Sequence, residues 1–171
     1  MYYNPNSKKP FFVQIKTNIY SSSSSSSSRV PKVTAHYTDV SSEEWVSIAI
    51  SEILSSHSKI DHLVTSAGFT ETMPALSYPI SAVRKLFSVN VDGTYLFAIA
   101  VAKHLIERKA KGSMVFIGSM SGAIVNLPQR QTPYNMSKAA VRHLAASLAV
   151  EWAEFGIRVN CISPGYMMTP L

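Results

Sequence analysis

The sequence predicts an α/β fold built on a parallel β-sheet. From Val30 onward, short segments with the apolar or alternating character of strands are separated by longer segments with helical periodicity. Strand and helix follow each other in turn, which is the pattern of βαβ units. Every predicted strand also ends in small or polar residues, as a ligand crevice at the carboxyl ends of parallel strands requires.

Four strands and three helices are predicted in this regular part of the chain. The strands are expected at residues 32–38, 60–65, 114–117 and 157–162, and the helices at 41–58, 81–111 and 135–155. The first helix starts with serine caps followed by Glu43 and Glu44 in its first turn. The second is expected to be interrupted near Val91–Gly93, and Gly156 closes the third. The strand at 114–117 is wholly apolar, which is typical of strands buried in parallel sheets.

The first 30 residues differ from the rest. Residues 1–30 form an irregular, low-complexity segment with eight consecutive serines, Ser21–Ser28, a composition that cannot bury a core. Residues 11–15 resemble a short strand, but nothing nearby in the sequence identifies its partner. We therefore divide the chain into this segment and one α/β domain, residues 31–171.

Composition and charge exclude several classes of protein. With 171 residues, 46% hydrophobic and 15% charged, the chain is globular and long enough for one core. The net charge of +6 does not indicate a nucleic-acid surface, because the densest basic patch, Arg108–Lys111, is expected at a helix end, where cations complement the dipole. The five histidines have no metal-ligand spacing, so we expect no metal site.

The sequence also gives no indication of a membrane or secreted protein. The longest uninterrupted apolar run, Tyr95–Ala102, is far shorter than a bilayer requires. No hydrophobic stretch of the signal-peptide type precedes Lys8 and Lys9. The single cysteine, Cys161, rules out an internal disulfide and fits a reducing compartment. We therefore expect a cytoplasmic protein that does not contact a membrane.

The segment Tyr134–Lys138 carries the chemistry. A tyrosine and a lysine four residues apart at the start of a helix lie on one face, with their side chains adjacent. An ammonium beside a phenol favours the phenolate and lowers the phenol pKa from about 10 toward neutral pH, so that the hydroxyl can transfer a proton. By itself such a pair occurs by chance in many helices, as an ordinary surface pair. The surrounding motifs decide between the two interpretations.

Those motifs resemble the short-chain dehydrogenase/reductase family. They are Asn90 within the segment 86–91, the run Gly118-Ser119-Met120-Ser121-Gly122, the run Arg158-Val159-Asn160, and the pair Pro164-Gly165. Their order and spacing, from about Val33 to the C-terminus, are most similar to fungal NADP-dependent ketose and polyol enzymes of the mannitol dehydrogenase or sorbose reductase type. The resemblance implies a Rossmann-like, three-layer αβα fold with a parallel sheet.

The resemblance also implies an oxidoreductase that transfers a hydride between NADPH and a carbonyl or alcohol. A ketose, a polyol or a related small carbonyl compound is the expected small-molecule substrate, and NADP(H) is favoured over NAD(H) as the cofactor. A complete protein of this kind is expected to form a homodimer or homotetramer. The helices at 81–111 and 135–155 resemble those of the family's dimer interface.

Individual roles follow from the same resemblance. Tyr134 is implied as the general acid in carbonyl reduction and the general base in alcohol oxidation, and Lys138 as the group that lowers its pKa and binds the nicotinamide ribose. Asn90 is implied to brace the helix bend and hold a water, and a serine to bind the substrate oxygen. Besides Tyr134 and Lys138, the residues implied at the cofactor are Asp39, Val40, Ser66, Ala67, Gly68, Pro164, Gly165, Met167 and Thr169. Ser66 stands where the family usually has asparagine.

Two serines compete for the substrate oxygen. Ser121 lies 13 positions before Tyr134, which is the commoner spacing in the family, and Ser119 lies 15 positions before it. Ser119 is favoured because it directly follows the predicted strand, and because family members with a Ser-Met-Ser-Gly run use the first serine. The other serine is expected to satisfy backbone groups in a turn.

The family's glycine-rich turn has no counterpart in this sequence. In the family this turn follows the first strand and binds the cofactor pyrophosphate through backbone amides. The chain has seven glycines, none of which precedes Gly68. The resemblance therefore implies an incomplete fold without the first βα unit and the C-terminal elements. Two alternatives stay open: a working reductase, and an inactive fragment or pseudoenzyme that acts at most as a dimerising module.

Overall fold

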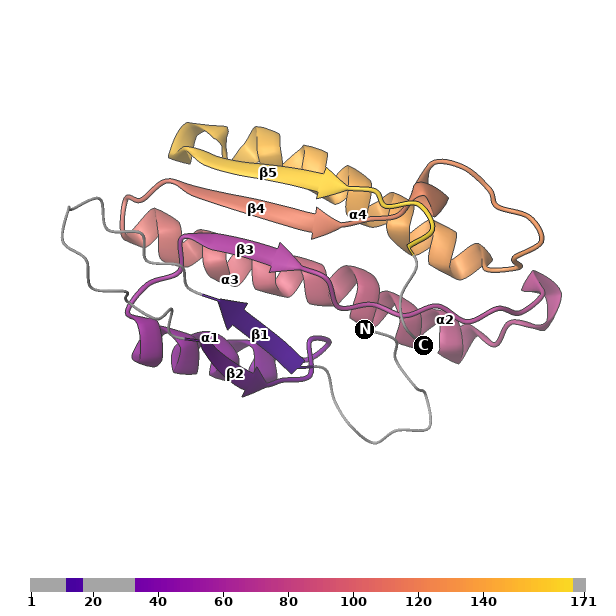
Figure 1. Cartoon of the computed structure of the whole chain (residues 1–171), viewed down its shortest axis with the longest axis horizontal. Helices are drawn as coiled ribbons and strands as arrows, with labels where there is room; N and C mark the ends of the chain where they lie inside the picture. The colour runs from indigo at the N-terminus through magenta and orange to yellow at the C-terminus, as the bar shows by residue number, and fades with distance from the viewer. Residues whose placement is uncertain (1–11, 17–32, 168–171) are drawn as a thin grey trace.

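A three-stranded parallel sheet with helices packed against it forms the centre of the structure. The computed structural model describes residues 12–16 and 33–167. In chain order the elements are β1 (Phe12–Lys16), β2 (Val33–Tyr37), α1 (Glu43–His57), β3 (His62–Thr65), η1 (Ala75–Ser77), α2 (Ile80–Phe87), η2 (Ser88–Asp92), α3 (Gly93–Glu107), β4 (Gly112–Ile117), η3 (Met120–Gly122), α4 (Thr132–Glu151), η4 (Ala153–Phe155) and β5 (Ile157–Ile162). Strands β3, β4 and β5 lie side by side and point the same way (Figure 1). The predicted α/β fold with a parallel sheet is confirmed.

The two faces of this sheet differ in burial. Side chains alternate between the faces of a strand, so one face of β4 carries Met114 and Phe116, both fully buried. The register aligns Met114 with Leu63 of β3 and Val159 of β5, which places these residues on the same face. On the opposite face Val64 is 63% exposed. One face therefore belongs to the core and the other is open.

Helices α3 and α4 cover the buried face and lie behind the sheet in Figure 1. Two successive right-handed crossovers in the same direction place their helices on the same side of a parallel sheet. The core between these layers includes Val101 and Leu105 of α3 and Val141 and Leu148 of α4. Within residues 33–167 no helix covers the opposite face, so the described residues form two of the three layers of the expected αβα arrangement.

Strand β2 does not join the parallel sheet, so the prediction for residues 32–38 is wrong on this point. It pairs with β1 in a separate antiparallel sheet, where Gln14 lies opposite Ala35. In doubly wound sheets the spatial strand order is 3-2-1-4-5-6. The third and fourth strands of the chain are therefore not neighbours in the sheet, because the first and second strands lie between them. In the described part of the chain no strand is hydrogen-bonded to both β2 and β3, so the two strands belong to separate sheets. The strand predicted at residues 11–15 does form, shifted by one residue, and β2 is the partner that the sequence did not identify.

Helix α1 begins at the predicted serine cap and ends at His57, one residue before its predicted end. Ser42 is the N-cap, and its hydroxyl accepts a hydrogen bond from the Trp45 backbone amide. Glu43 and Glu44 in the first turn interact favourably with the helix dipole. Ser58 follows as the C-cap in a left-handed conformation, with φ at 65°.

The interruption predicted in the second long helix is a π-helical turn, η2, between α2 and α3. Gly93 follows it directly and contacts the first strand–helix connection, because a Cβ at this position would lie 2.9 Å from the Val40 side chain. Single π turns inside helices are frequent at functional sites. Asn90 lies at the centre of this one and is only 1% exposed.

One helical segment, Ile80–Glu107, is long and apolar enough to span a membrane by length and composition, with a mean hydropathy of 1.2 over its best window. Half of that window is buried within the structure. Core helices of soluble proteins satisfy the same criterion, so the segment is weak evidence for a membrane span.

Candidate active site

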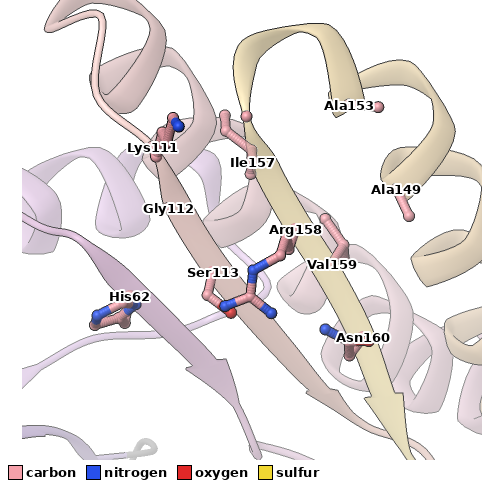
Figure 2. A pocket seen from close by; sticks show the side chains of 11 residues that line it. His62, Lys111, Gly112, Ser113, Ala149, Ala153, Ile157, Arg158, Val159 and Asn160 are labelled. Carbon is pink, nitrogen blue, oxygen red and sulfur yellow. The ribbon is translucent and has the colours of Figure 1, made fainter.

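Two hollows lie at opposite ends of the sheet. The larger, of about 700 Å³, lies at the amino ends of β4 and β5. Figure 2 shows Ser113 and Arg158 on these strands and the small side chains of Ala149 and Ala153 nearby. This hollow contains none of the predicted site residues. The smaller, of about 470 Å³, lies at the carboxyl ends of the strands, where parallel sheets bind ligands, and is the candidate active site.

Three loops and one helix enclose the candidate cavity. The loops follow β3, β4 and β5, and the helix is α4. The lining consists of Ser66, Gly68, Phe69, Thr70, Thr72, Ile117, Gly118, Ser119, Met120, Ser121, Asn126, Gln129, Gln131, Tyr134, Lys138, Pro164, Gly165, Tyr166 and Met167. Among these residues Lys138 alone carries a charge, and hydroxyl and carboxamide groups supply most of the other polar atoms.

Backbone contacts hold the loops after β4 and β5 together. Gly118 N donates to Ile162 O at 2.8 Å, and Met120 N donates to Pro164 O at 3.0 Å. Gly122 packs directly on α4, because a Cβ there would lie 2.7 Å from the carbonyl carbon of Lys138. Only glycine permits this approach, which brings the turn that carries the two serines onto the helical turn that carries the lysine.

Lys138 is buried, with 6% of its surface exposed. Its Nζ donates to the Ile117 carbonyl at the end of β4, at 2.7 Å, and lies 5.7 Å from the centre of the Tyr134 ring. Burial lowers the pKa of Lys138 to about 8, and Cys161 acts in the opposite direction. The ammonium form still predominates at neutral pH, which leaves a positive charge beside the tyrosine at the edge of the cavity.

Asn90 ties three segments of the site together. Its side chain forms two hydrogen bonds with the Phe69 backbone, accepting from N and donating to O at 3.0 Å each. It also donates to the Ser137 hydroxyl on α4 at 3.0 Å. The loop after β3 is thereby attached to α4 through η2. The role of bracing the helix bend, which the resemblance implies for Asn90, stays a prediction. The water that the resemblance implies at Asn90 stays a prediction.

The two competing serines have different surroundings. Ser119 is half-buried, and its hydroxyl accepts from Ser121 N at 3.1 Å. The Ser121 hydroxyl is buried and accepts from two carboxamides, those of Asn126 and Gln131. Both serines line the cavity, so the geometry keeps both within reach of a ligand. The preference for Ser119 stays a prediction.

The remaining predicted cofactor residues fall into three groups. Ser66, Gly68, Pro164, Gly165 and Met167 line the cavity. Ala67 and Val40 pack against or within a hydrophobic cluster, and one Asp39 carboxylate oxygen accepts two hydrogen bonds from Ser41, so these three are not among the lining residues. Thr169 lies outside the described residues.

A group of polar residues around the cavity was not predicted from the sequence. Asn126, Gln129 and Gln131 come from the connection between η3 and α4. Tyr166 donates to Gln129 Oε1 at 2.7 Å, which joins the loop after β5 to this connection. The density of carboxamides between Gly122 and Tyr134 was the available signal, but a loop lacks the periodicity that would have placed them in a cavity.

The cavity fits the nicotinamide end of a dinucleotide better than its pyrophosphate end. At Gly68 a Cβ would lie 3.1 Å from Asn90 Oδ1 and 3.6 Å from Lys138 Nζ, so glycine keeps open the space above the lysine. Lys138 supplies one cation and hydrogen-bond donor suited to a ribose hydroxyl. The backbone amides of a glycine-rich turn, which bind pyrophosphate, have no counterpart in the sequence before Gly68.

The chain is similar to known oxidoreductases over most of its length. A family profile described as enoyl-(acyl carrier protein) reductase matches residues 13–171. The D-arabinitol 2-dehydrogenase (ribulose-forming) of Scheffersomyces stipitis is 45% identical over 145 residues, which cover 84% of this chain and 52% of that protein. The NADH-dependent L-xylulose reductase of Ambrosiozyma monospora is 46% identical, with 83% and 53% covered. A sorbose reductase of Candida albicans is 41% identical, with 82% and 50% covered. The chain thus spans about half the length of these relatives.

Solved structures agree with these sequence matches. A short-chain type dehydrogenase/reductase from Mycobacterium marinum superposes with a TM-score of 0.75 at 35% identity, covering 76% of this chain and 51% of that one. An NAD+-bound xylitol dehydrogenase gives 0.73 at 32% identity, with 79% and 51% covered. A gluconate 5-dehydrogenase from Burkholderia cenocepacia in complex with NADP and tartrate gives 0.71 at 34% identity, with 77% and 50% covered. Both forms of the nicotinamide cofactor therefore occur among the structural neighbours.

Proposed function

Since the chain belongs to the short-chain dehydrogenase/reductase family, we propose that its cavity is the proton-transfer site of a reductase that interconverts a ketose or related small carbonyl compound and the corresponding alcohol. One observation carries this proposal. The buried ammonium of Lys138 lies beside the Tyr134 ring in a cavity at the carboxyl ends of a parallel sheet. The polyol and ketose names of the relatives support the substrate class.

In carbonyl reduction, the Tyr134 hydroxyl gives its proton to the developing alkoxide, and it takes the proton back in alcohol oxidation. The Lys138 ammonium stabilises the phenolate that remains, because its charge is held in a buried position. The Ser119 hydroxyl binds the substrate oxygen and orients it toward the tyrosine. Asn90 acts indirectly, by holding the loop after β3 against α4.

The cofactor supplies or accepts the hydride when it is bound. Lys138 would hold the nicotinamide ribose, and the residues around Pro164 and Gly165, with Met167 and Thr169, would enclose the nicotinamide. Ser66, Ala67 and Gly68, in the loop directly after β3, would also contact the cofactor. Asp39 and Val40 would contact its adenine. Gly68 supports this assignment because a larger residue would fill the space over the lysine.

NADP(H) is the proposed form of the cofactor, with NAD(H) as the alternative. The net charge of +6 favours the form with the additional phosphate. The test is a comparison of kcat/KM for NADPH and NADH with the same ketose. A higher value for NADH would exclude the NADP(H) preference.

A homodimer or homotetramer in the cytoplasm is the proposed state of the complete protein. Helices α3 and α4 support such an assembly, because they carry exposed apolar residues, including Tyr95, Met136 and Val150. Small exposed residues such as Ala139 and Ala146 on α4 would permit close helix contact. Sedimentation analysis of the wild type and Val150→Lys tests the interface, since loss of the larger species is expected in the variant.

The second candidate, which the sequence analysis leaves open, is an inactive, dimerising module. Titration of the purified chain with NADPH, followed by cofactor fluorescence, separates the two candidates. A reductase binds NADPH and consumes it when a ketopentose is added, and Tyr134→Phe retains binding but loses consumption. An inactive module shows neither binding nor consumption.

A further inference from the structure

We propose that Ser121 donates a hydrogen bond to a substrate hydroxyl next to the reacting carbonyl, and that the cavity thereby selects α-hydroxy ketones over simple ketones. This inference rests on the proposed reductase function and narrows its substrate class. It begins from one arrangement in the cavity wall, where two carboxamide groups converge on a single serine oxygen.

A serine hydroxyl has two lone pairs that accept and one hydrogen that it can donate. Asn126 Nδ2 donates to Ser121 Oγ at 2.9 Å, and Gln131 Nε2 donates to the same oxygen at 3.3 Å. Both lone pairs are then used, so Ser121 can interact further only as a donor. In the described part of the structure the Ser121 hydroxyl accepts these two hydrogen bonds and donates none to another residue.

The direction of these bonds is set by a third contact. Thr70 on the loop after β3 donates to Gln131 Oε1 at 3.5 Å, which turns Nε2 of the same amide toward Ser121. Gln131 is 9% exposed and lies three residues before Tyr134, at the start of α4. Gln131 and Asn126 are therefore positioning residues, because they act on the substrate through Ser121.

The hydroxyl hydrogen of Ser121 is available to a ligand bound in the cavity. Ser121 is 6% exposed and lines the cavity, and a buried donor without a partner is unfavourable. An oxygen of a bound ligand removes this penalty. Ser121 thus offers a fixed donor to a substrate oxygen that can accept.

Ser119 and Ser121 together suit two neighbouring oxygens. Ser119 accepts one hydrogen bond, from Ser121 N, and retains a lone pair and its hydrogen for the reacting oxygen. Ser121 lies two residues further along the same turn and is free to donate to the adjacent hydroxyl. Apart from Lys138, the polar side chains that line the cavity are hydroxyls and carboxamides, which can form hydrogen bonds with the hydroxyl and carbonyl oxygens of a ketose.

The test compares hydroxyacetone with acetone, which differ by one hydroxyl group, in the wild type, Ser121→Ala and Ser121→Thr with NADPH present. Binding is measured by ligand-detected NMR and turnover by NADPH consumption. Loss of one neutral hydrogen bond corresponds to a decrease of about three- to tenfold. We expect this decrease for hydroxyacetone with Ser121→Ala, no decrease for acetone, and retention of hydroxyacetone affinity with Ser121→Thr.

Equal effects of Ser121→Ala on both ketones would overturn the inference, as would absence of hydroxyacetone binding to the folded wild type. Selective binding without turnover of either ketone would support the inference and reject the reductase function, so the two failures are distinguishable.

Gln131→Glu provides a second test that does not delete the serine. A carboxylate accepts hydrogen bonds only, so it would take the hydrogen of Ser121 and leave none for the substrate. We expect the preference for hydroxyacetone over acetone to fall by the same factor as with Ser121→Ala. An unchanged preference in a folded Gln131→Glu variant would contradict the proposed direction of the hydrogen bonds.

Discussion

Replacing Lys138 by methionine separates the functional role of this residue from its effect on stability. The pKa of Lys138 falls from 10.5 to about 8 because burial disfavours the ammonium form. Below pH 8 the lysine is charged in both the folded and the unfolded chain, and the folded state bears the full cost of desolvating it. Methionine has a similar length and no charge, so it removes this cost.

The size of the effect follows from the pKa difference. At about 1.4 kcal/mol for each pH unit, a fall from 10.5 to about 8 corresponds to about 3 kcal/mol. The variant also loses the 2.7 Å hydrogen bond to the Ile117 carbonyl, which costs about 1–3 kcal/mol. At pH 7 we therefore expect Lys138→Met to be as stable as the wild type, or more stable by up to about 2 kcal/mol.

The pH dependence is the more decisive measurement. Between pH 8 and 10.5 the unfolded chain binds a proton at Lys138 that the folded chain does not, so the stability of the wild type rises with pH relative to the variant. Denaturant unfolding from pH 7 to 10.5 should show the difference changing by about 3 kcal/mol in favour of the wild type. Lys103→Met, at an exposed position of α3, controls for the loss of one positive charge. A difference that is independent of pH would refute the assignment of Lys138 as a buried cation.

Three further variants test other parts of the account. Tyr134→Phe should abolish ketose reduction while leaving NADPH affinity within about twofold, because the hydroxyl carries the proton; more than a few per cent of residual turnover would contradict this role. Gly122→Ala should lower the free energy of unfolding by about 1–3 kcal/mol, because its Cβ would lie 2.7 Å from the Lys138 backbone, whereas Gly165→Ala, whose nearest contact is Met120 Sδ at 3.6 Å, should have little effect. Val64→Lys should reduce self-association in light scattering, because it places a charge on the open face of edge strand β3, while the control Leu76→Lys, at a fully exposed position outside the sheet, should not; the same aggregation in both would exclude this face as its cause.

The sequence predicts those elements whose signals are local. The cap at Ser42 and the acids after it place the start of α1, and Gly156, with φ at 71°, separates α4 and η4 from β5 as expected. Strand β5 has the predicted bounds, Ile157–Ile162, and within it the buried Ile157 and Val159 alternate with the exposed Arg158 and Asn160, as in a strand with one face toward the core.

The pairing of β2 was not predictable in the same way. A strand pattern indicates an extended segment with a given face, but the partner depends on contacts between distant parts of the chain. Residues 33–37 alternate as expected, yet they pair with β1 and not with β3. The open face of the parallel sheet has the same origin, since strand patterns alone do not show which face a helix covers.

The site was predicted best where a motif defines neighbours on one helix. Tyr134 and Lys138 lie together because their spacing matches a helical turn, whereas the hydrogen bond from Asn90 to Ser137 of α4 was not predicted. The carboxamides of Asn126 and Gln131 were missed because their hydrogen bonds to Ser121 depend on the path of a loop. The number of residues between each serine and Tyr134 could not assign roles to Ser119 and Ser121, because the two serines differ in their hydrogen-bond partners, which the spacing does not show.

The most direct test of the central claim is NADPH titration of the wild type and Lys138→Met, with saturation-transfer NMR of the bound cofactor. If the cavity around Lys138 and Tyr134 holds the nicotinamide end, the nicotinamide protons should receive saturation in the wild type. Lys138→Met should then weaken NADPH binding by at least about tenfold, which corresponds to the loss of one charge-assisted hydrogen bond. Equal affinity in the two proteins, or saturation confined to the adenine protons, would contradict the assignment of this cavity as the active site.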